Sequence, residues 1–252
     1  MDKLTRFVAL SAMVIIVALA MTSFPATESE ASGTDVATVN GITYPTLTEA
    51  IGTATDGDTV VLIDDTAVDT TIYVTNSITL DLNGHTITNN ISEDRLFYVT
   101  ASSFVVNGMD EGSSMVIPES NTGSYGFIKV ADTSVITING GTYTGDTDNG
   151  AFIKIFSDGE LDASGSTIIL NDVTMTSNGR FISTDTLSTD ASTPTLIVNG
   201  GTYTTEGKAF GTDTVYLSPI TFTDVTVTAG TGPCIEVCGS AATFTDCVFT
   251  VT

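Results

Sequence analysis

The stretch Leu196-Ile-Val-Asn-Gly-Gly-Thr-Tyr-Thr204 decides the fold, because similar stretches recur along the chain. The other copies are Leu80–Thr88, Ile136–Thr144, Ile168–Thr176, Ile220–Thr228 and Ala242–Thr250, with a partial copy at Phe104–Asn107. When the position of Asn199 is taken as the marker, successive copies are separated by 22 to 32 residues. A repeat of this length indicates a stacked-repeat architecture.

The pattern inside each copy predicts strands. Apolar residues alternate with polar ones and are biased toward β-branched and aromatic types. After a two-residue corner, a second short strand has an apolar centre between threonines, as at Tyr143 and Tyr203. A third strand follows, for example at residues 126–130 and 151–155. Three short strands per repeat without an intervening helix predict an all-β fold, a right-handed parallel β-helix of about seven coils.

Asparagine recurs at the first corner of the repeat. The residues concerned are Asn83, Asn107, Asn139, Asn171 and Asn199. Coils of such a fold stack about 4.8 Å apart, so identical corner amides would lie above one another and form a hydrogen-bonded ladder. The glycines that follow supply the tight backbone geometry of the corner.

This combination of short strands and asparagine corners resembles the pectate-lyase-like superfamily of right-handed β-helix proteins over residues 40–252. The resemblance implies a fold and does not by itself imply an activity. Lyases of that superfamily use calcium-binding carboxylates with a basic residue, and the hydrolases use clustered aspartates with a histidine. Neither a Gly-His-Gly nor an Arg-Ile-Lys motif is present, and the acidic pair Asp64-Asp65 has no basic neighbours. We therefore predict no catalytic residues, and a polysaccharide lyase or hydrolase remains the alternative.

The first 31 residues have the features of a secretory signal peptide. Lys3 and Arg6 precede an apolar run from Phe7 to Met21, and cleavage after Ala20 or Ala31 is compatible with the small residues there. An uncleaved membrane anchor is the alternative, although the run is short for a bilayer. Either interpretation predicts an extracellular or cell-surface location for a single domain at 32–252.

The two ends of that domain differ. Thr46 and Glu49 form a capping-box pattern before the apolar face of Leu47, Ala50, Ile51 and Ala54, which predicts a short N-terminal capping helix. At the other end, Phe244–Thr252 matches the repeat and no capping segment follows it. An uncovered coil exposes strand edges, so we expect the domain to be truncated or open there, or to associate end to end.

Charge limits the partners. The formal net charge is -23, which disfavours nucleic acid and anionic lipid as partners. No cofactor is predicted apart from calcium, for which Asp158, Glu160 and Asp162 are weak candidate ligands in one loop. In so acidic a chain such a cluster is more often a solvated loop.

The single histidine and the three cysteines have structural interpretations. His85 occupies the column that holds Gly141 and Gly201 in other copies, so we expect it to point inward as a structural residue. Outside the cytoplasm one disulfide is plausible, and a pair between Cys238 and Cys247 is preferred over one between Cys234 and Cys238.

Two further patterns suggest surfaces for a partner. Phe127, Lys129, Phe152 and Lys154 share one face of their strands, because an unpaired ammonium is costly to bury and the isoleucines should then face inward. This face would be a strip for a glycan or protein, unless loops cover the phenylalanines.

The second pattern consists of threonines. Five Thr-x-Thr pairs lie on one outward face and resemble the ice-binding faces of β-helical antifreeze proteins. They are Thr86/Thr88, Thr142/Thr144, Thr174/Thr176, Thr202/Thr204 and Thr226/Thr228.

Together these features predict a non-catalytic, secreted or cell-surface protein with a structural or adhesive role. It resembles the adhesin-like repeat proteins of prokaryotic surfaces. Glycan binding is part of this hypothesis, and ice binding is a second alternative.

Overall fold

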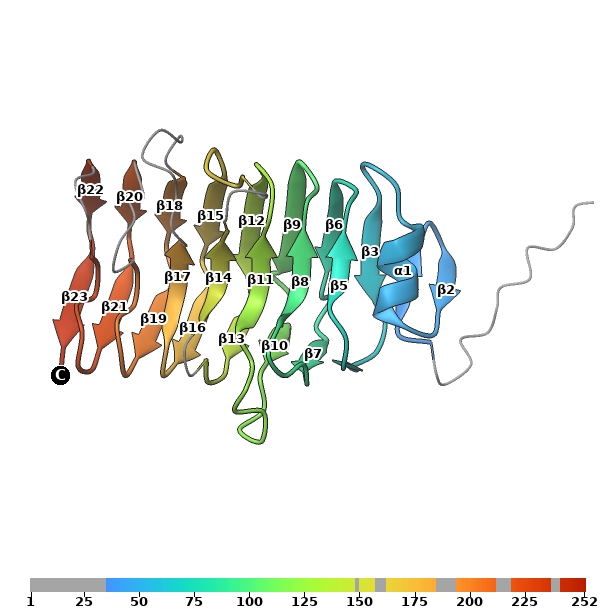
Figure 1. Ribbon diagram of the computed structural model, residues 1–252, viewed down its shortest axis with the longest axis horizontal. Helices are drawn as coiled ribbons and strands as arrows, with labels where there is room; N and C mark the ends of the chain where they lie inside the picture. Colours follow the sequence, from blue (N-terminus) through green and yellow to red (C-terminus); the bar gives the residue numbers. More distant parts are fainter. Residues whose placement is uncertain (1–34, 148–149, 157–161, 185–193, 212–218, 237–240) are drawn as a thin grey trace, which may run out of the picture. The chain divides into compact units, whose positions relative to one another are not determined.

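The computed structural model describes residues 35–147, 150–156, 162–184, 194–211, 219–236 and 241–252. These residues form a parallel β-solenoid, in which the chain winds repeatedly through three sheets that we call A, B and C (Figure 1). The predicted all-β solenoid with one short helix is therefore confirmed. The expected signal peptide at 1–31 lies outside the described residues. Within the described part of the chain, no helix is long and apolar enough to cross a membrane.

Sheet A begins with an antiparallel hairpin and continues with parallel strands. Its strands are β1 (Ala37–Val39), β2 (Ile42–Tyr44), β3 (Thr59–Leu62), β6 (Ile78–Asp81), β9 (Ser103–Gly108), β12 (Val135–Gly140), β15 (Thr167–Asn171), β18 (Thr195–Asn199), β20 (Ile220–Thr223) and β22 (Ala242–Thr245).

Sheets B and C contain only parallel pairs among the described strands. Sheet B consists of β4 (Thr66–Val68), β7 (Thr86–Asn89), β10 (Ser114–Val116), β13 (Thr142–Thr144), β16 (Thr174–Ser177), β19 (Thr202–Thr205), β21 (Thr226–Ala229) and β23 (Val248–Val251). Sheet C consists of β5 (Ile72–Val74), β8 (Arg95–Val99), β11 (Gly126–Val130), β14 (Ala151–Ile155) and β17 (Arg180–Thr184).

Five coils, from β3–β5 to β15–β17, have a described strand in all three sheets, fewer than the seven expected. The later coils add strands to sheets A and B. On the third side, the described residues of these coils form single-residue bridges, in which Phe210 pairs with Ile182 and with Ile235.

The N-terminal end of the solenoid is covered by helix α1 (Leu47–Thr53). Thr46 is its N-cap, and the Thr46 hydroxyl accepts a hydrogen bond from the Glu49 backbone N–H at 3.1 Å. The apolar face predicted for this helix is buried. The preceding hairpin of β1 and β2 was not predicted. Its signal was the Asn40-Gly41 pair, in which both residues have positive φ angles (52° and 79°), as the tight turn of a hairpin requires.

The core consists of columns of similar side chains from successive coils. Along sheet A, alternate residues such as Ile136 and Ile138 point inward, as the sequence pattern predicts. An aromatic column adds to these apolar contacts. Its rings belong to Phe127, Phe152, Phe181 and Phe210, and neighbouring ring centroids are 4.8, 5.9 and 5.5 Å apart. Each fully buried side chain of this size contributes about 1.5–3 kcal/mol to folding, so stacking the coils is the main source of stability.

The corner after sheet A requires a left-handed backbone conformation. The residues that follow the marker position have φ angles between 52° and 71°, and they are Gly140, Asp172, Gly200, Asp224 and Asp246. Glycine adopts this conformation without strain, and aspartate tolerates it better than most other residues. At the next position, Gly201 has φ 93°, and a Cβ atom there would collide with the Val173 backbone of the neighbouring coil. The glycines of the motif therefore permit close stacking at this corner.

Candidate functional site

An amide ladder runs along the end of sheet A. The Asn139 Nδ2 donates to Asn107 Oδ1 at 2.8 Å, Asn171 donates to Asn139 at 2.8 Å, and Asn199 donates to Asn171 at 2.9 Å. The two middle amides, Asn139 and Asn171, thus each donate to the previous coil and accept from the next one. The ladder fixes the register of four coils and lies partly at the surface, so its role is structural.

Asn83 does not belong to this ladder, which corrects the prediction for that residue. Its Nδ2 donates to the backbone oxygen of Leu62 at 2.9 Å, and Asp81 pairs with Asn107 in its place. The reason is a longer corner: four residues, 82–85, separate Asp81 from Thr86, whereas two residues separate Asn139 from Thr142 in the equivalent positions. The sequence alignment placed Asn83-Gly84 over Asn139-Gly140 and therefore missed this shift.

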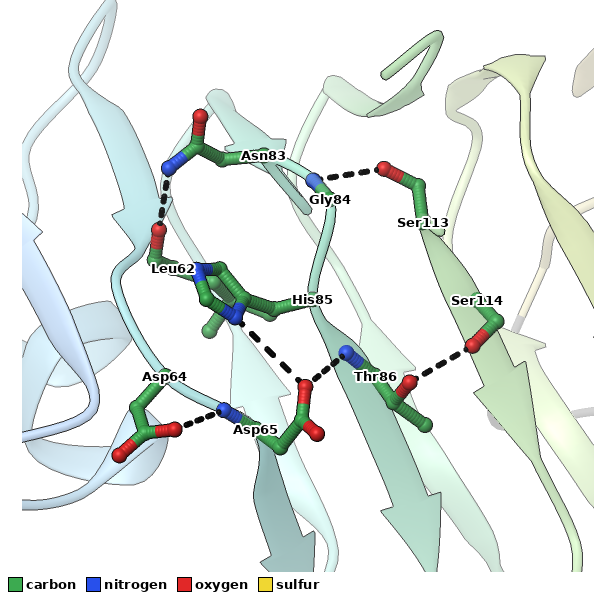
Figure 2. A network of polar contacts seen from close by, with 9 residues as sticks. All are labelled: Leu62, Asp64, Asp65, Asn83, Gly84, His85, Thr86, Ser113 and Ser114. Atoms are coloured by element: carbon green, nitrogen blue, oxygen red, sulfur yellow. Dashed lines mark hydrogen bonds and ion pairs between the residues drawn. The ribbon is translucent and has the colours of Figure 1, made fainter. Parts of the chain in front are cut away.

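His85 is also displaced by the longer corner. It is half-exposed instead of pointing into the core, so its predicted inward orientation is wrong. Figure 2 shows the His85 Nδ1 facing Asp65 Oδ1 at 3.6 Å, while the same oxygen accepts a hydrogen bond from the Thr86 backbone N–H at 2.8 Å. On the other side of this corner, the Gly84 N–H donates to the Ser113 hydroxyl at 2.9 Å. These bonds connect three successive coils, so the network supports the corner.

The acidic loop proposed for calcium is only partly visible. Asp158 and Glu160 lie outside the described residues, whereas Asp162 accepts a hydrogen bond from the Ser164 backbone N–H at 3.0 Å. Hydrogen bonds from the Ser164 hydroxyl and backbone lower the pKa of Asp162 below its usual range. Within the described residues, no group of three or more histidine, cysteine, aspartate or glutamate side chains is arranged to hold a metal ion.

The cysteines are not paired as expected. Cys234 and Cys247 are free thiols, and the Cys247 Sγ lies 3.2 Å from the backbone oxygen of Thr245. Cys238 lies outside the described residues. The preferred bridge between Cys238 and Cys247 is therefore not formed in this structure.

The predicted strip of Phe127, Lys129, Phe152 and Lys154 is wrong for its two phenylalanines. Phe127 and Phe152 are buried, with 2% and 0% of their surface exposed. They occupy the corner where the chain enters sheet C, and there two consecutive residues, Phe127 and Ile128, both point inward. Simple alternation holds along a strand and fails at such a corner, where Gly126 has φ 122°. Only the lysines remain at the surface.

The lysines belong instead to an outward column on sheet C. Tyr73 pairs with Tyr98, Tyr98 with Lys129, and Lys129 with Lys154 in the register of the parallel strands. The Tyr73 and Tyr98 rings are 5.2 Å apart, and Tyr73 is 62% exposed. We call Tyr73, Tyr98, Lys129, Lys154 and Phe156 the sheet C strip. Its rungs have the spacing of adjacent strands, about 4.8 Å.

The lysines of the sheet C strip lie over aromatic rings. The Lys129 Nζ is 4.9 Å from the centroid of Tyr98 and 4.2 Å from that of Phe156, and the Lys154 Nζ is 5.3 Å from the Phe156 centroid. Contacts of this kind are attractive by about 0.5–1 kcal/mol at exposed sites. They hold the ammonium groups next to the rings, so charge and flat apolar surface are presented together.

A shallow hollow of about 500 Å³ adjoins the strip. Its lining combines acidic, basic and aromatic side chains: Glu93, Asp94, Arg95, Tyr125, Lys129, Lys154 and Phe156. The Arg95 guanidinium is buried and lies 5.7 Å from the centroid of the Tyr125 ring. The hollow can therefore offer hydrogen-bond donors, acceptors and ring faces to one ligand.

All basic residues of 35–252 lie on the sheet C side. Arg95, Lys129, Lys154 and Arg180 belong to strands of sheet C, and Lys208 precedes Phe210, whose bridge to Ile182 continues that sheet. The strands of sheets A and B contain no lysine or arginine. In a chain with a net charge of -23, the lysine and arginine charges of 35–252 thus lie on one side, where Glu93 and Asp94 are their acidic neighbours.

Sheet B presents hydroxyl groups instead. Thr142, Thr174, Thr202 and Thr226 are exposed and lie in one column, and Ser114 continues that column in the coil that lacks a Thr-x-Thr pair. The second threonines of these pairs border a groove of about 790 Å³, together with residues 116–119. The threonine array is thus more continuous than the sequence indicated, because β10 was not recognised as a strand.

Sequence reasoning found the lysines of the candidate site but missed the tyrosines. Tyr73 and Tyr98 lie in coils without a lysine, so only the strand register reveals the column.

Comparisons of this chain with protein-family models, with curated proteins and with solved structures found no match.

Proposed function

We propose that the chain is a non-catalytic, secreted or cell-surface protein with a structural or adhesive role, and that it attaches to its partner through the sheet C strip. The observation that carries this proposal is the outward column from Tyr73 to Lys154, where aromatic rings and ammonium groups stack at the surface. Exposed aromatic side chains next to charged groups are typical of binding surfaces.

The solenoid itself supports an attachment role. The amide ladder and the aromatic column connect successive coils, so the outward columns are held at a regular spacing. A regular column suits a partner that is itself repetitive, such as a surface glycan, because several weak contacts then act together.

Adhesion of coated beads tests this proposal. Beads that carry the purified protein are incubated with cell envelopes of the producing organism, and we expect the wild type to adhere several-fold better than Tyr73→Ser/Lys129→Gln. Equal adhesion of the two proteins, or no adhesion of either, would overturn the proposal.

A second experiment tests for enzymatic activity. The same preparation is mixed with polygalacturonate and calcium, from which we expect no release of unsaturated or reducing sugar. Release that disappears in Asp162→Ala would favour the lyase or hydrolase alternative.

Ice binding is the second candidate, because Thr142, Thr174, Thr202 and Thr226 form an exposed, in-register column. The groove beside residues 116–119 interrupts the flatness of that surface. We expect no thermal hysteresis from the purified protein. Hysteresis that is lost in Thr174→Tyr would put this function in place of adhesion.

A further inference from the structure

We infer that Asn90 carries an N-linked glycan, which is attached before the coil around this residue folds. The inference goes beyond the proposed attachment function and shares one premise with it, the export of the chain from the cell. Asn90-Ile-Ser92 is the only Asn-X-Ser/Thr sequence in residues 1–252, and its middle residue is not proline. So short a motif also occurs by chance, and the structure around Asn90 decides whether a glycan fits there.

The fold treats two neighbouring asparagines differently. Asn89 ends strand β7 and is fully buried. Its Nδ2 donates to the Gly126 backbone oxygen at 3.0 Å, and its Oδ1 accepts from the Ile91 N–H at 3.0 Å. Asn90, the next residue, is exposed at the corner between β7 and β8. A bulky, hydrated glycan therefore has no room at Asn89, whereas at Asn90 it extends into solvent.

The hydrogen bond of the Asn90 side chain is compatible with a glycan. Its Nδ2 donates to Asp69 Oδ1 at 3.0 Å, and this pair is exposed. An N-linked sugar replaces one of the two hydrogens on Nδ2, so the other hydrogen can still be donated to Asp69. Ser92 and Glu93 on the same corner are exposed as well. The folded chain thus accommodates a glycan on Asn90 without losing this hydrogen bond.

The backbone of the motif indicates when the glycan is added. Ile91, the middle residue, is only 5% exposed, and its backbone oxygen accepts a hydrogen bond from Asn121 Nδ2 at 3.0 Å. Glu93 then turns the chain with a φ angle of 63°, and its N–H donates to the Gly123 oxygen at 2.8 Å. A transferase that recognises three consecutive residues cannot surround a segment held in this way. We therefore expect transfer to the unfolded chain.

The transfer is a substitution at a sugar carbon. The Asn90 Nδ2 attacks C1 of a lipid-linked oligosaccharide, in which the sugar chain is held on a polyprenyl phosphate carrier. The bond between Nδ2 and C1 forms, and the bond between C1 and the phosphate oxygen breaks. The lipid phosphate leaves with the electron pair, and one Nδ2 proton passes to a base of the transferase. Ser92 supplies the hydroxyl group that the transferase recognises two residues after the asparagine.

Expression of the full chain in a cell that secretes N-glycoproteins tests the site. We expect mass spectrometry of the secreted protein to find a glycan on the proteolytic peptide that contains Asn90. Asn90→Gln and Ser92→Ala should each lose this glycan, and Ser92→Thr should keep it because the hydroxyl group is retained. Thr100→Ala is the matched control, since it removes an exposed hydroxyl group outside the motif. A secreted wild type without a glycan on Asn90 would overturn the inference.

Transfer in vitro tests the order of glycosylation and folding. A purified oligosaccharyltransferase and a lipid-linked oligosaccharide are mixed with the folded chain or with the chain as it refolds from denaturant. We expect several-fold more transfer to the refolding chain. Asn121→Ala should make the folded chain a better acceptor, because Asn121 Nδ2 holds the backbone oxygens of Asn89 and Ile91. Equal transfer to the folded and the refolding wild type would contradict attachment before folding.

The glycan and the attachment function fail in different ways. If the secreted protein adheres to envelopes through the sheet C strip but carries no glycan, the glycan is wrong and the attachment function stands. If the protein is glycosylated on Asn90 and does not adhere, the attachment function is wrong and the glycan stands. A chain that is neither exported nor glycosylated would overturn both.

Discussion

Asn171 illustrates how a single polar residue fixes the stacking of coils. Its Nδ2 donates to Asn139 and its Oδ1 accepts from Asn199, so both sides of the amide are used. Removing the amide leaves a donor on one neighbour and an acceptor on the other without their partner. Such groups cost about 1–3 kcal/mol each when they are shielded from water.

We expect Asn171→Leu to lower the free energy of unfolding by about 1–3 kcal/mol, because both ladder bonds are lost. Denaturant unfolding measures this change. Thr221→Leu is the control, since Thr221 lies on the outward side of the nearby strand β20. Equal stability of Asn171→Leu and the wild type would show that the ladder contributes nothing to stacking.

Two buried tyrosine hydroxyl groups lower the stability of the core. The hydroxyl groups of Tyr143 and Tyr203 are buried and have no hydrogen-bond partner among the described residues. Burial raises the pKa of both side chains, and for Tyr203 the nearby Asp172 adds to this effect. The folded protein thus keeps protons that the unfolded chain loses above about pH 10, so these groups reduce stability as the pH rises through that region.

The variant Tyr143→Phe/Tyr203→Phe is therefore expected to be more stable than the wild type by about 1 kcal/mol or more at neutral pH. It should also lose less stability than the wild type when the pH is raised above about 10. Thermal unfolding at both pH values measures the two effects, with the half-buried Tyr44→Phe as control. A less stable double variant would mean that the hydroxyl groups do have partners.

At the scale of elements, the first and the last described coils have different neighbours. Helix α1 buries Leu47, Ala50 and Ile51 and shields the first coils. In the last described coil, β22 and β23 have no further neighbour among the described strands. Their side chains Phe244 and Phe249 are 45% and 40% exposed. An unpaired edge with exposed apolar residues favours pairing with another copy of the chain.

Light scattering over a concentration series tests whether copies of the chain associate through β22 and β23. We expect the purified protein to associate as its concentration rises, and we expect Val248→Lys/Phe249→Ser to remain monomeric to higher concentrations. Tyr73→Ser, which changes an exposed aromatic residue on sheet C, is the control. A wild type that stays monomeric throughout would refute association through this coil.

Strand elements and corners differed in how well the sequence predicted them. Within strands such as β12 and β15, alternation correctly separates inward from outward residues. At the entrance to sheet C, Phe127 and Ile128 both point inward, because the chain changes direction there. The strip predicted from alternation was consequently wrong for its phenylalanines and right about the exposure of its lysines.

For the whole molecule, charge and architecture act together. The sequence has a net charge of -23, which limits its partners but does not locate a binding face. The fold brings Lys129 and Lys154, which are 25 residues apart in sequence, to neighbouring positions on the outer face of sheet C. Since coils stack in parallel, residues one repeat apart become neighbours, so the two lysines form one column together with Tyr73 and Tyr98.

The sequence by itself determined the repeat, the strands within each repeat, the capping helix and the acidity of the surface, because these depend on local patterns and on composition. Only the tertiary structure decided which positions of successive coils lie above one another. Corners vary in length, so Asp81 and not Asn83 lies over Asn107, and Tyr98 lies beside Lys129. Such register results from backbone pairing between coils, which the sequence of one coil does not contain.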